Sequence, residues 1–155
     1  MTVPSETRPG LTRQDGYWAG RFRAMASPCE ILTETDDEQC AQELLDIAAA
    51  EASRIESKFS RYIRGNIVDR INRSEGDPVA VDEETAHLLD FADRIFRLSD
   101  GAFDITSGVF RKAWKFDGGS HVPKSAEIDE LLGLVGWTKV QWNALSLSLQ
   151  PGMQI

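Results

Sequence analysis

Hydrophobic residues recur at helical spacing in two long segments of the sequence. From Asp37 to about Phe59 they fall three or four positions apart, with acids near the start and bases near the end, as the helix dipole favours. From Glu83 to Ser99 a second periodic segment follows Asp82, a residue type that caps helices. The side chains expected to face inward there are Leu88, Leu89, Phe91, Ala92, Ile95 and Phe96. The pattern predicts two long amphipathic helices.

Shorter segments predict the remaining elements. Alternation of apolar and polar residues favours strands at 17–25 and 29–34, a short strand at 79–81, and a hairpin of 138–142 with 145–149. Short helices are expected at 66–72 and 125–134, the latter capped by Ser125. Residues 1–16, polar and with two prolines, are interpreted as a flexible N-terminal arm, and residues 17–155 as one domain. The predicted fold class is α+β, with helices packed on a mostly antiparallel sheet.

The segment Ser99–Trp114 joins the second long helix to a further helix expected near Gly108. If Thr106 or Ser107 caps that helix, its first N–H groups can hold a phosphate, and Asp104 can accept a hydrogen bond from a sugar or heterocycle. The alternative is an ordinary helix corner, in which Asp104 and Thr106 satisfy nearby backbone groups. Two further residues are equally ambiguous: Tyr62 can stack on a flat ligand or simply pack, and Met25 can line a pocket or a core.

Composition narrows the classes of function. The chain has 155 residues, 41% hydrophobic and 27% charged, which is typical of a soluble globular protein. A net charge of −8 argues against a nucleic-acid surface and against docking on an anionic membrane, although backbone N–H groups or a divalent cation can still hold a phosphorylated ligand. The polar N-terminus lacks the apolar core of a signal peptide, and no apolar segment has the length of a membrane span, so a cytoplasmic location without a membrane anchor is expected.

Cysteine and histidine suggest no metal site. Cys29 and Cys40 form no CxxC or Cys/His cluster and are expected to be small buried apolar residues. His87 and His121 have no second ligand at metal-binding spacing, so a surface or packing role is favoured for both.

Seven motifs, in this order, resemble the first half of one family. They are AM-x-x-x-C (from Ala24), EASRIESKFSRY (51–62), NIVDRIN (66–72), ETAHLLDFAD (84–93), SDGAFDITSGVFRKAW (99–114), LLGLVGW (131–137) and PGM (151–153). The family is ApbE, the FAD:protein FMN transferases, formerly called thiamine biosynthesis lipoproteins. The resemblance extends from about residue 17 to residue 155.

The resemblance implies a T-fold-like architecture, an activity and a set of ligand-binding residues. Enzymes of the family use Mg²⁺ to split the pyrophosphate of FAD and transfer FMN to a threonine or serine hydroxyl of an acceptor protein. The flavin-site residues that match here are Met25, Tyr62, Ala102, Phe103 and Asp104. No catalytic residue is assigned, and the Mg²⁺ ligands are expected beyond residue 155. The acceptor protein and the oligomeric state, a homodimer included, are left open.

The sequence also departs from the family. Ala26-Ser27 stands where the family often has Gly-Thr, and no lipoprotein signal is visible. The abrupt end at Met153–Ile155 is interpreted as the end of a fragment with little activity of its own. Two alternatives remain: a non-catalytic flavin-binding module, and a structural or interaction domain that has lost the ligand.

Overall fold

The computed structural model describes residues 9–114 and 122–155. The chain divides into two compact units, Met1–Asn66 and Ile67–Ile155. The sequence alone indicated one domain from residue 17, so this division is a finding of the structure. Each unit is described by itself.

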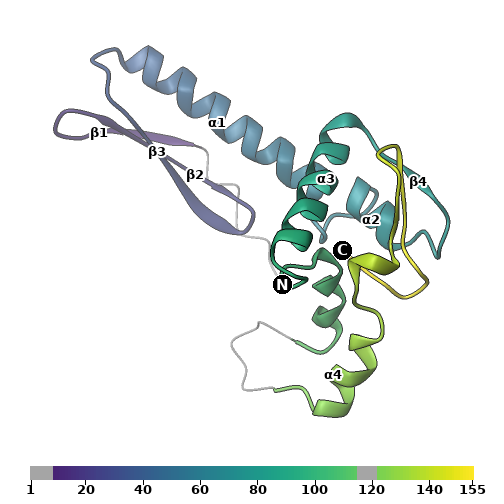
Figure 1. Cartoon of the computed structure of the whole chain (residues 1–155). Coiled ribbons are helices and arrows are strands. Elements are labelled where there is room, and N and C mark those ends of the chain that lie inside the picture. Colours follow the sequence, from purple (N-terminus) through teal and green to yellow (C-terminus); the bar gives the residue numbers. More distant parts are fainter. Residues whose placement is uncertain (1–8, 115–121) are drawn as a thin grey trace. The chain divides into compact units, whose positions relative to one another are not determined.

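A three-stranded antiparallel sheet and one long helix form the first unit (Figure 1). Its strands, in the order β1-β2-β3, are β1 (Gly10–Arg13), β2 (Trp18–Ala24) and β3 (Ser27–Thr33), followed by α1 (Glu38–Phe59). Gly20 of β2 lies against α1, where the buried side chain of Leu45 fills the space that a Cβ would occupy. This close approach fixes the helix on the sheet.

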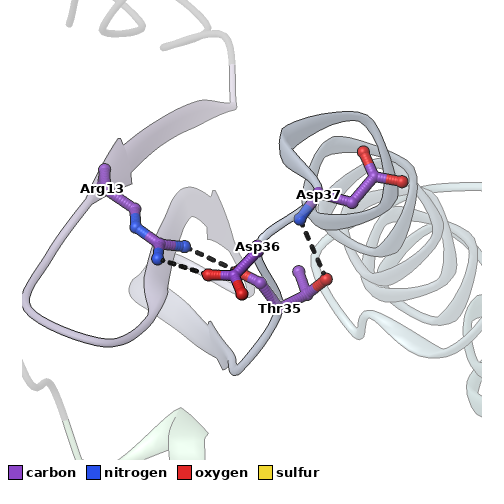
Figure 2. A network of polar contacts seen from close by, with 4 residues as sticks. All are labelled: Arg13, Thr35, Asp36 and Asp37. Atoms are coloured by element: carbon purple, nitrogen blue, oxygen red, sulfur yellow. Dashed lines mark hydrogen bonds and ion pairs between the residues drawn. The ribbon is translucent and has the colours of Figure 1, made fainter.

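A set of polar contacts ties β1 to the segment before α1 (Figure 2). The Arg13 guanidinium donates to the Thr35 carbonyl oxygen at 2.6 Å and forms an ion pair with Asp36 at 3.0 Å. The Thr35 hydroxyl accepts from the Asp37 N–H at 3.2 Å. Asp37 in turn caps α1, because its carboxylate accepts from the Gln39 and Cys40 N–H groups. The connection is therefore ordered by hydrogen bonds to β1 and to the first turn of α1.

The second unit combines one long helix and several short ones with a small antiparallel sheet (Figure 1). Its helices are α2 (Ile67–Asn72), α3 (Glu83–Leu98), the 3₁₀ helix η1 (Ile105–Lys112), α4 (Ser125–Leu132) and the 3₁₀ helix η2 (Trp137–Lys139). The strands β4 (Val79–Ala80), β5 (Gln141–Trp142) and β6 (Ser146–Ser148) pair in the order β4-β6-β5. The core contains Ile71, Leu89, Trp137, Leu147 and Met153.

The structure confirms the mixed α+β class with antiparallel sheets and the two long helices. The predicted hairpin of 138–142 with 145–149 is confirmed for β5 and β6, but its first two residues belong to η2. The prediction of a flexible arm through residue 16 is wrong for Gly10–Arg13, which form β1 and pair with β2. Residues 1–8 and the glycine-rich loop around His121 lie outside the described residues. Strand β3 starts earlier than expected and includes Pro28, which an edge strand tolerates because part of its backbone faces away from the sheet.

Several details of packing and capping also differ from the sequence-based expectations. Leu88 and Phe91 were expected to face inward but are 50% and 62% exposed, because α3 buries only the face that carries Leu89 and Ala92. Helix α4 ends at Leu132, with Gly133 as its C-cap, rather than at residue 134, and its N-cap is Lys124 rather than Ser125. Both cysteines are free and half-buried rather than buried.

Candidate functional site

The β2–β3 turn places Met25 in an unusual backbone conformation. Met25 and Ala26 have φ angles of 52° and 58°, between the paired residues Ala24 and Ser27. A two-residue hairpin turn with positive φ at both positions matches the twist of the strands, but it normally recruits Asn or Gly. Holding non-glycine residues there costs roughly 1–2 kcal/mol each. The turn is therefore strained, and Met25, at its tip, is 56% exposed.

Tyr62 lies in the segment that follows α1. The helix ends at Phe59, and the Ser60 hydroxyl accepts from the Tyr62 N–H at 3.3 Å. Asn66 fixes the same segment by donating through Nδ2 to the Ser60 carbonyl oxygen at 2.6 Å and to that of Ser57 at 3.2 Å. The Tyr62 residue is nevertheless 75% exposed. An ordered backbone thus presents an aromatic side chain to solvent.

Met25 and Tyr62 line the same hollow in the first unit. Its volume is about 280 Å³, close to the lower end of the range for small-molecule sites. The remaining lining residues come from the turn, from the end of α1 and from the segment after it: Ala26, Ile55, Glu56, Phe59, Ser60 and Arg61. Apolar and aromatic walls with a few polar groups suit a flat heterocycle better than a phosphate.

The second unit contains Ala102, Phe103 and Asp104, and their exposure differs. Ala102 and Phe103 are exposed, Phe103 by 45%, whereas Asp104 is half-buried. The Phe103 N–H donates to the Ser99 hydroxyl at 2.9 Å, and the Ala102 N–H donates to the Ser99 carbonyl oxygen at 3.0 Å. The segment is therefore anchored to the end of α3 while its two side chains face solvent.

The Asp104 carboxylate makes three hydrogen bonds within the protein. Its Oδ1 accepts from the Thr106 N–H at 2.8 Å and from the Thr106 hydroxyl at 2.6 Å, and its Oδ2 accepts from the Trp137 N–H at 2.8 Å. The Thr106 hydroxyl oxygen also accepts from the Gly136 N–H at 2.8 Å. We term these four residues the junction network. It uses three of the roughly four acceptor positions of the carboxylate.

This geometry corrects the sequence-based hypothesis for the start of η1. The expected cap was Thr106 or Ser107, with free N–H groups available to an anion. The helix instead begins at Ile105 with Asp104 as its N-cap. Thr106 is fully buried, and both its N–H and its hydroxyl are used inside the protein. The hypothesis of a phosphate cap at Thr106 is therefore wrong.

The five predicted site residues fall into two groups, one in each unit. The structure brings Met25 and Tyr62 together at one hollow, and it places Ala102, Phe103 and Asp104 in one segment. Sequence reasoning missed Ile55 and Phe59 as lining residues, although their spacing on one helix face was visible. It also missed Gly136 and Trp137, which were part of a recognised motif but carried no chemical signal of their own.

Two other properties bear on the site. The described part of the chain holds no group of three or more His, Cys, Asp or Glu side chains that could bind a metal ion. No helix within residues 9–114 and 122–155 is long and apolar enough to cross a membrane.

Solved structures with the same fold include several flavin transferases. The ApbE protein of Thermotoga maritima is 29% identical, with a TM-score of 0.73, over 90% of this chain and 46% of that chain. The flavinyl transferase ApbE of Pseudomonas stutzeri is 19% identical, with a TM-score of 0.66, over 100% and 50%. The flavin transferase ApbE of Vibrio cholerae is 20% identical, with a TM-score of 0.72, over 95% and 48%. The last two, at these identities, show the fold alone.

These similarities define the class as a mixed α+β protein with the fold of flavin transferases. The ApbE family model matches residues 25–155, so the chain belongs to the ApbE family. It spans about half the length of the solved relatives. A search of curated proteins found no match.

Proposed function

We propose that this chain acts in the transfer of FMN from FAD to a threonine or serine hydroxyl of an acceptor protein, and that its own part is to bind the flavin nucleotide. Membership of the ApbE family supports this proposal, and so does the flavin transferase activity of the solved relatives. The resemblance implies flavin-site roles for Met25 and Tyr62, which lie in the first unit, and for the Ala102–Asp104 segment, which lies in the second. A cytoplasmic location is part of the same proposal.

The hollow formed by Met25, Phe59 and Tyr62 is the observation that carries the proposal. An isoalloxazine ring is flat, largely apolar on its faces and polar at its edge, so aromatic and thioether side chains suit its faces. The strained Met25-Ala26 turn adds to the argument, because backbone strain persists where the surrounding structure holds it and concentrates at ligand sites.

In the proposed reaction the acceptor hydroxyl oxygen forms a bond to the phosphorus of the FMN moiety. The bond from that phosphorus to the bridging pyrophosphate oxygen breaks, AMP leaves, and the hydroxyl proton passes to a base. Mg²⁺, when bound, neutralises charge on the phosphates. The described residues form no group of three or more His, Cys, Asp or Glu side chains that could hold a metal ion, so the proposal assigns no Mg²⁺ ligand to them. The proposal therefore gives this chain binding and orientation of the nucleotide, and little transferase activity by itself.

Titration of the purified 155-residue chain with FAD tests the binding role. We expect saturable quenching of flavin fluorescence and a higher melting temperature, because a ligand that binds only the folded state stabilises it. Riboflavin and ADP, titrated separately, show whether the ring or the nucleotide end supplies the affinity. Absence of both binding and stabilisation would contradict the proposal and favour a domain that has lost its ligand.

A second assay tests the expected lack of turnover. The chain is incubated with FAD, Mg²⁺ and a threonine-containing acceptor peptide, and covalent flavin is measured by mass. A matched peptide with alanine at the acceptor position is the control. Tight FAD binding without labelling supports the binding role and is also the result expected of a non-catalytic flavin-binding module. Efficient Mg²⁺-dependent labelling would show that this chain is a complete transferase.

A further inference from the structure

The burial pattern around Asp104 changes abruptly along the chain. Ala102 and Phe103 are exposed, Asp104 is half-buried, and Thr106 is 0% exposed. The exposed pair is held on its N-terminal side by Ser99 and on its C-terminal side by the junction network. Hydrogen-bonded residues thus flank, on both sides, two residues that face solvent.

The network also connects parts of the chain that are distant in sequence. Thr106 bonds to Gly136, and Asp104 bonds to Trp137, across 30 and 33 positions. The Trp137 indole Nε1 donates at 2.8 Å to Asp93 on α3, and Trp137 is only 6% exposed. Trp137 therefore bonds both to α3 and to Asp104, and Phe103 lies in the chain segment between these two points.

We propose that Asp104 and Thr106 are positioning residues: their hydrogen bonds to Gly136 and Trp137 hold the neighbouring Ala102–Phe103 segment in the geometry that binds the nucleotide. This inference rests on the proposed function. It differs from the role that the family resemblance implies for Asp104, because the ligand is contacted by the exposed segment rather than by the carboxylate. The hydrogen bonds already made by both carboxylate oxygens support this assignment.

Two substitutions of Thr106 form a matched pair of variants. Thr106→Val keeps the branched shape but removes the hydroxyl, so the Gly136 N–H and Asp104 Oδ1 each lose a partner. Thr106→Ser retains the hydroxyl. We expect Thr106→Val to raise the Kd for FAD about tenfold, the equivalent of about 1.4 kcal/mol, and Thr106→Ser to remain within about threefold of the wild type.

Amide hydrogen exchange, measured by NMR on the same full chain, supplies a readout that does not depend on FAD. We expect Thr106→Val to accelerate exchange at both Gly136 and Phe103 about tenfold, and Thr106→Ser to restore protection at both. Phe103 is the informative position, because its N–H bonds to Ser99 and not to the substituted residue. Thermal unfolding confirms that the variants are folded under the conditions of the assay.

The outcomes separate this inference from the proposed function. If Thr106→Val leaves Phe103 exchange and FAD affinity at wild-type values, the network is structural only and the inference is wrong. If Asp104→Asn weakens FAD binding while exchange at Gly136, Trp137 and Phe103 is unchanged, the carboxylate contacts the ligand directly, which also overturns it. If the wild type does not bind FAD, the proposed function fails, and Phe103 exchange in Thr106→Val still decides whether the network positions the segment.

Discussion

The hollow in the first unit and the junction network in the second are built in opposite ways. Met25 and Tyr62 are 56% and 75% exposed and come from a strained turn and a post-helix segment. Thr106 and Trp137 are 0% and 6% exposed, and their polar groups are paired. Side chains of the first kind contribute little to folding and can serve a ligand. Side chains of the second kind contribute to folding. They can affect ligand binding only indirectly, by fixing the position of the backbone to which they are bonded.

The largest expected effect comes from removing the Asp104 carboxylate. Asp104→Ala leaves the Trp137 N–H, the Thr106 N–H and the Thr106 hydroxyl without their acceptor. At about 1 kcal/mol or more for each unpaired donor in a half-buried or buried place, we expect a loss of about 3 kcal/mol of unfolding free energy. Urea denaturation followed by circular dichroism measures it.

A matched control for Asp104→Ala is Asp129→Ala, which removes an exposed carboxylate from α4 in the same unit. We expect it to change stability by less than about 0.5 kcal/mol. Equal losses of unfolding free energy for the two substitutions would show that Asp104 stabilises the protein no more than a surface acid does. The proposed contrast between the hollow and the junction network would then be wrong.

The second effect concerns the packing that supports the hollow. Gly20→Ala places a Cβ 2.8 Å from Leu45 Cδ1 and 3.2 Å from Ile31 Cγ1, and Leu45 is fully buried. Overpacking of this kind costs about 1–3 kcal/mol, so a lower melting temperature is expected. In the control Gly10→Ala, the added Cβ has no atom within 4 Å, and stability should remain unchanged. A stable Gly20→Ala variant would mean that α1 sits further from β2 in solution.

The third effect separates ligand binding from folding. Tyr62→Ala removes an exposed ring, so we expect unfolding free energy to change by less than about 0.5 kcal/mol while the Kd for FAD rises about tenfold, the loss of one aromatic stacking contact. Tyr62→Phe keeps the ring and should bind within about threefold of the wild type. Fluorescence titration gives both affinities. If Tyr62→Ala binds FAD as the wild type does, the hollow is not the flavin site.

Much of the fold could be predicted from the sequence, because α1 and α3 have clear helical periodicity and the β5–β6 hairpin has turn residues at its centre. Strand β1 was missed because its four residues have no alternating pattern and are ordered by pairing with β2. The periodicity also placed Leu88 in the core, which is wrong. A stripe of apolar residues on a helix does not show which of two neighbouring faces is buried against the rest of the protein.

The candidate site was less accessible to sequence reasoning. Motif resemblance singled out Met25 and Tyr62, but their common hollow depends on where the β2–β3 turn meets the end of α1. The role of Asp104 depends on Gly136 and Trp137, which lie more than 30 positions away and approach it only in the folded unit. Hydrogen-bond partners at such separations leave no local pattern in the chain.

The smallest effect tests the strain in the β2–β3 turn. Ala26 has a φ of 58°, in the left-handed region that glycine adopts freely. Other members of the ApbE family often have glycine at this position. Ala26→Gly relieves about 1–2 kcal/mol of strain, offset by about 0.5–1 kcal/mol of additional chain entropy lost on folding. We therefore expect a gain of about 0.5 kcal/mol, a rise of roughly 2–4 °C in Tm for a unit of this size.

The neighbouring Ala24→Gly is the control for this small gain. Ala24 belongs to β2 and is 5% exposed, so glycine there loses a buried methyl and increases the entropy cost of folding, and stability should fall by about 1 kcal/mol. Opposite signs for the two substitutions would show that the turn is left-handed at position 26 in solution. If Ala26→Gly destabilises the protein as Ala24→Gly does, the turn is unstrained, and strain no longer distinguishes the hollow from the junction network.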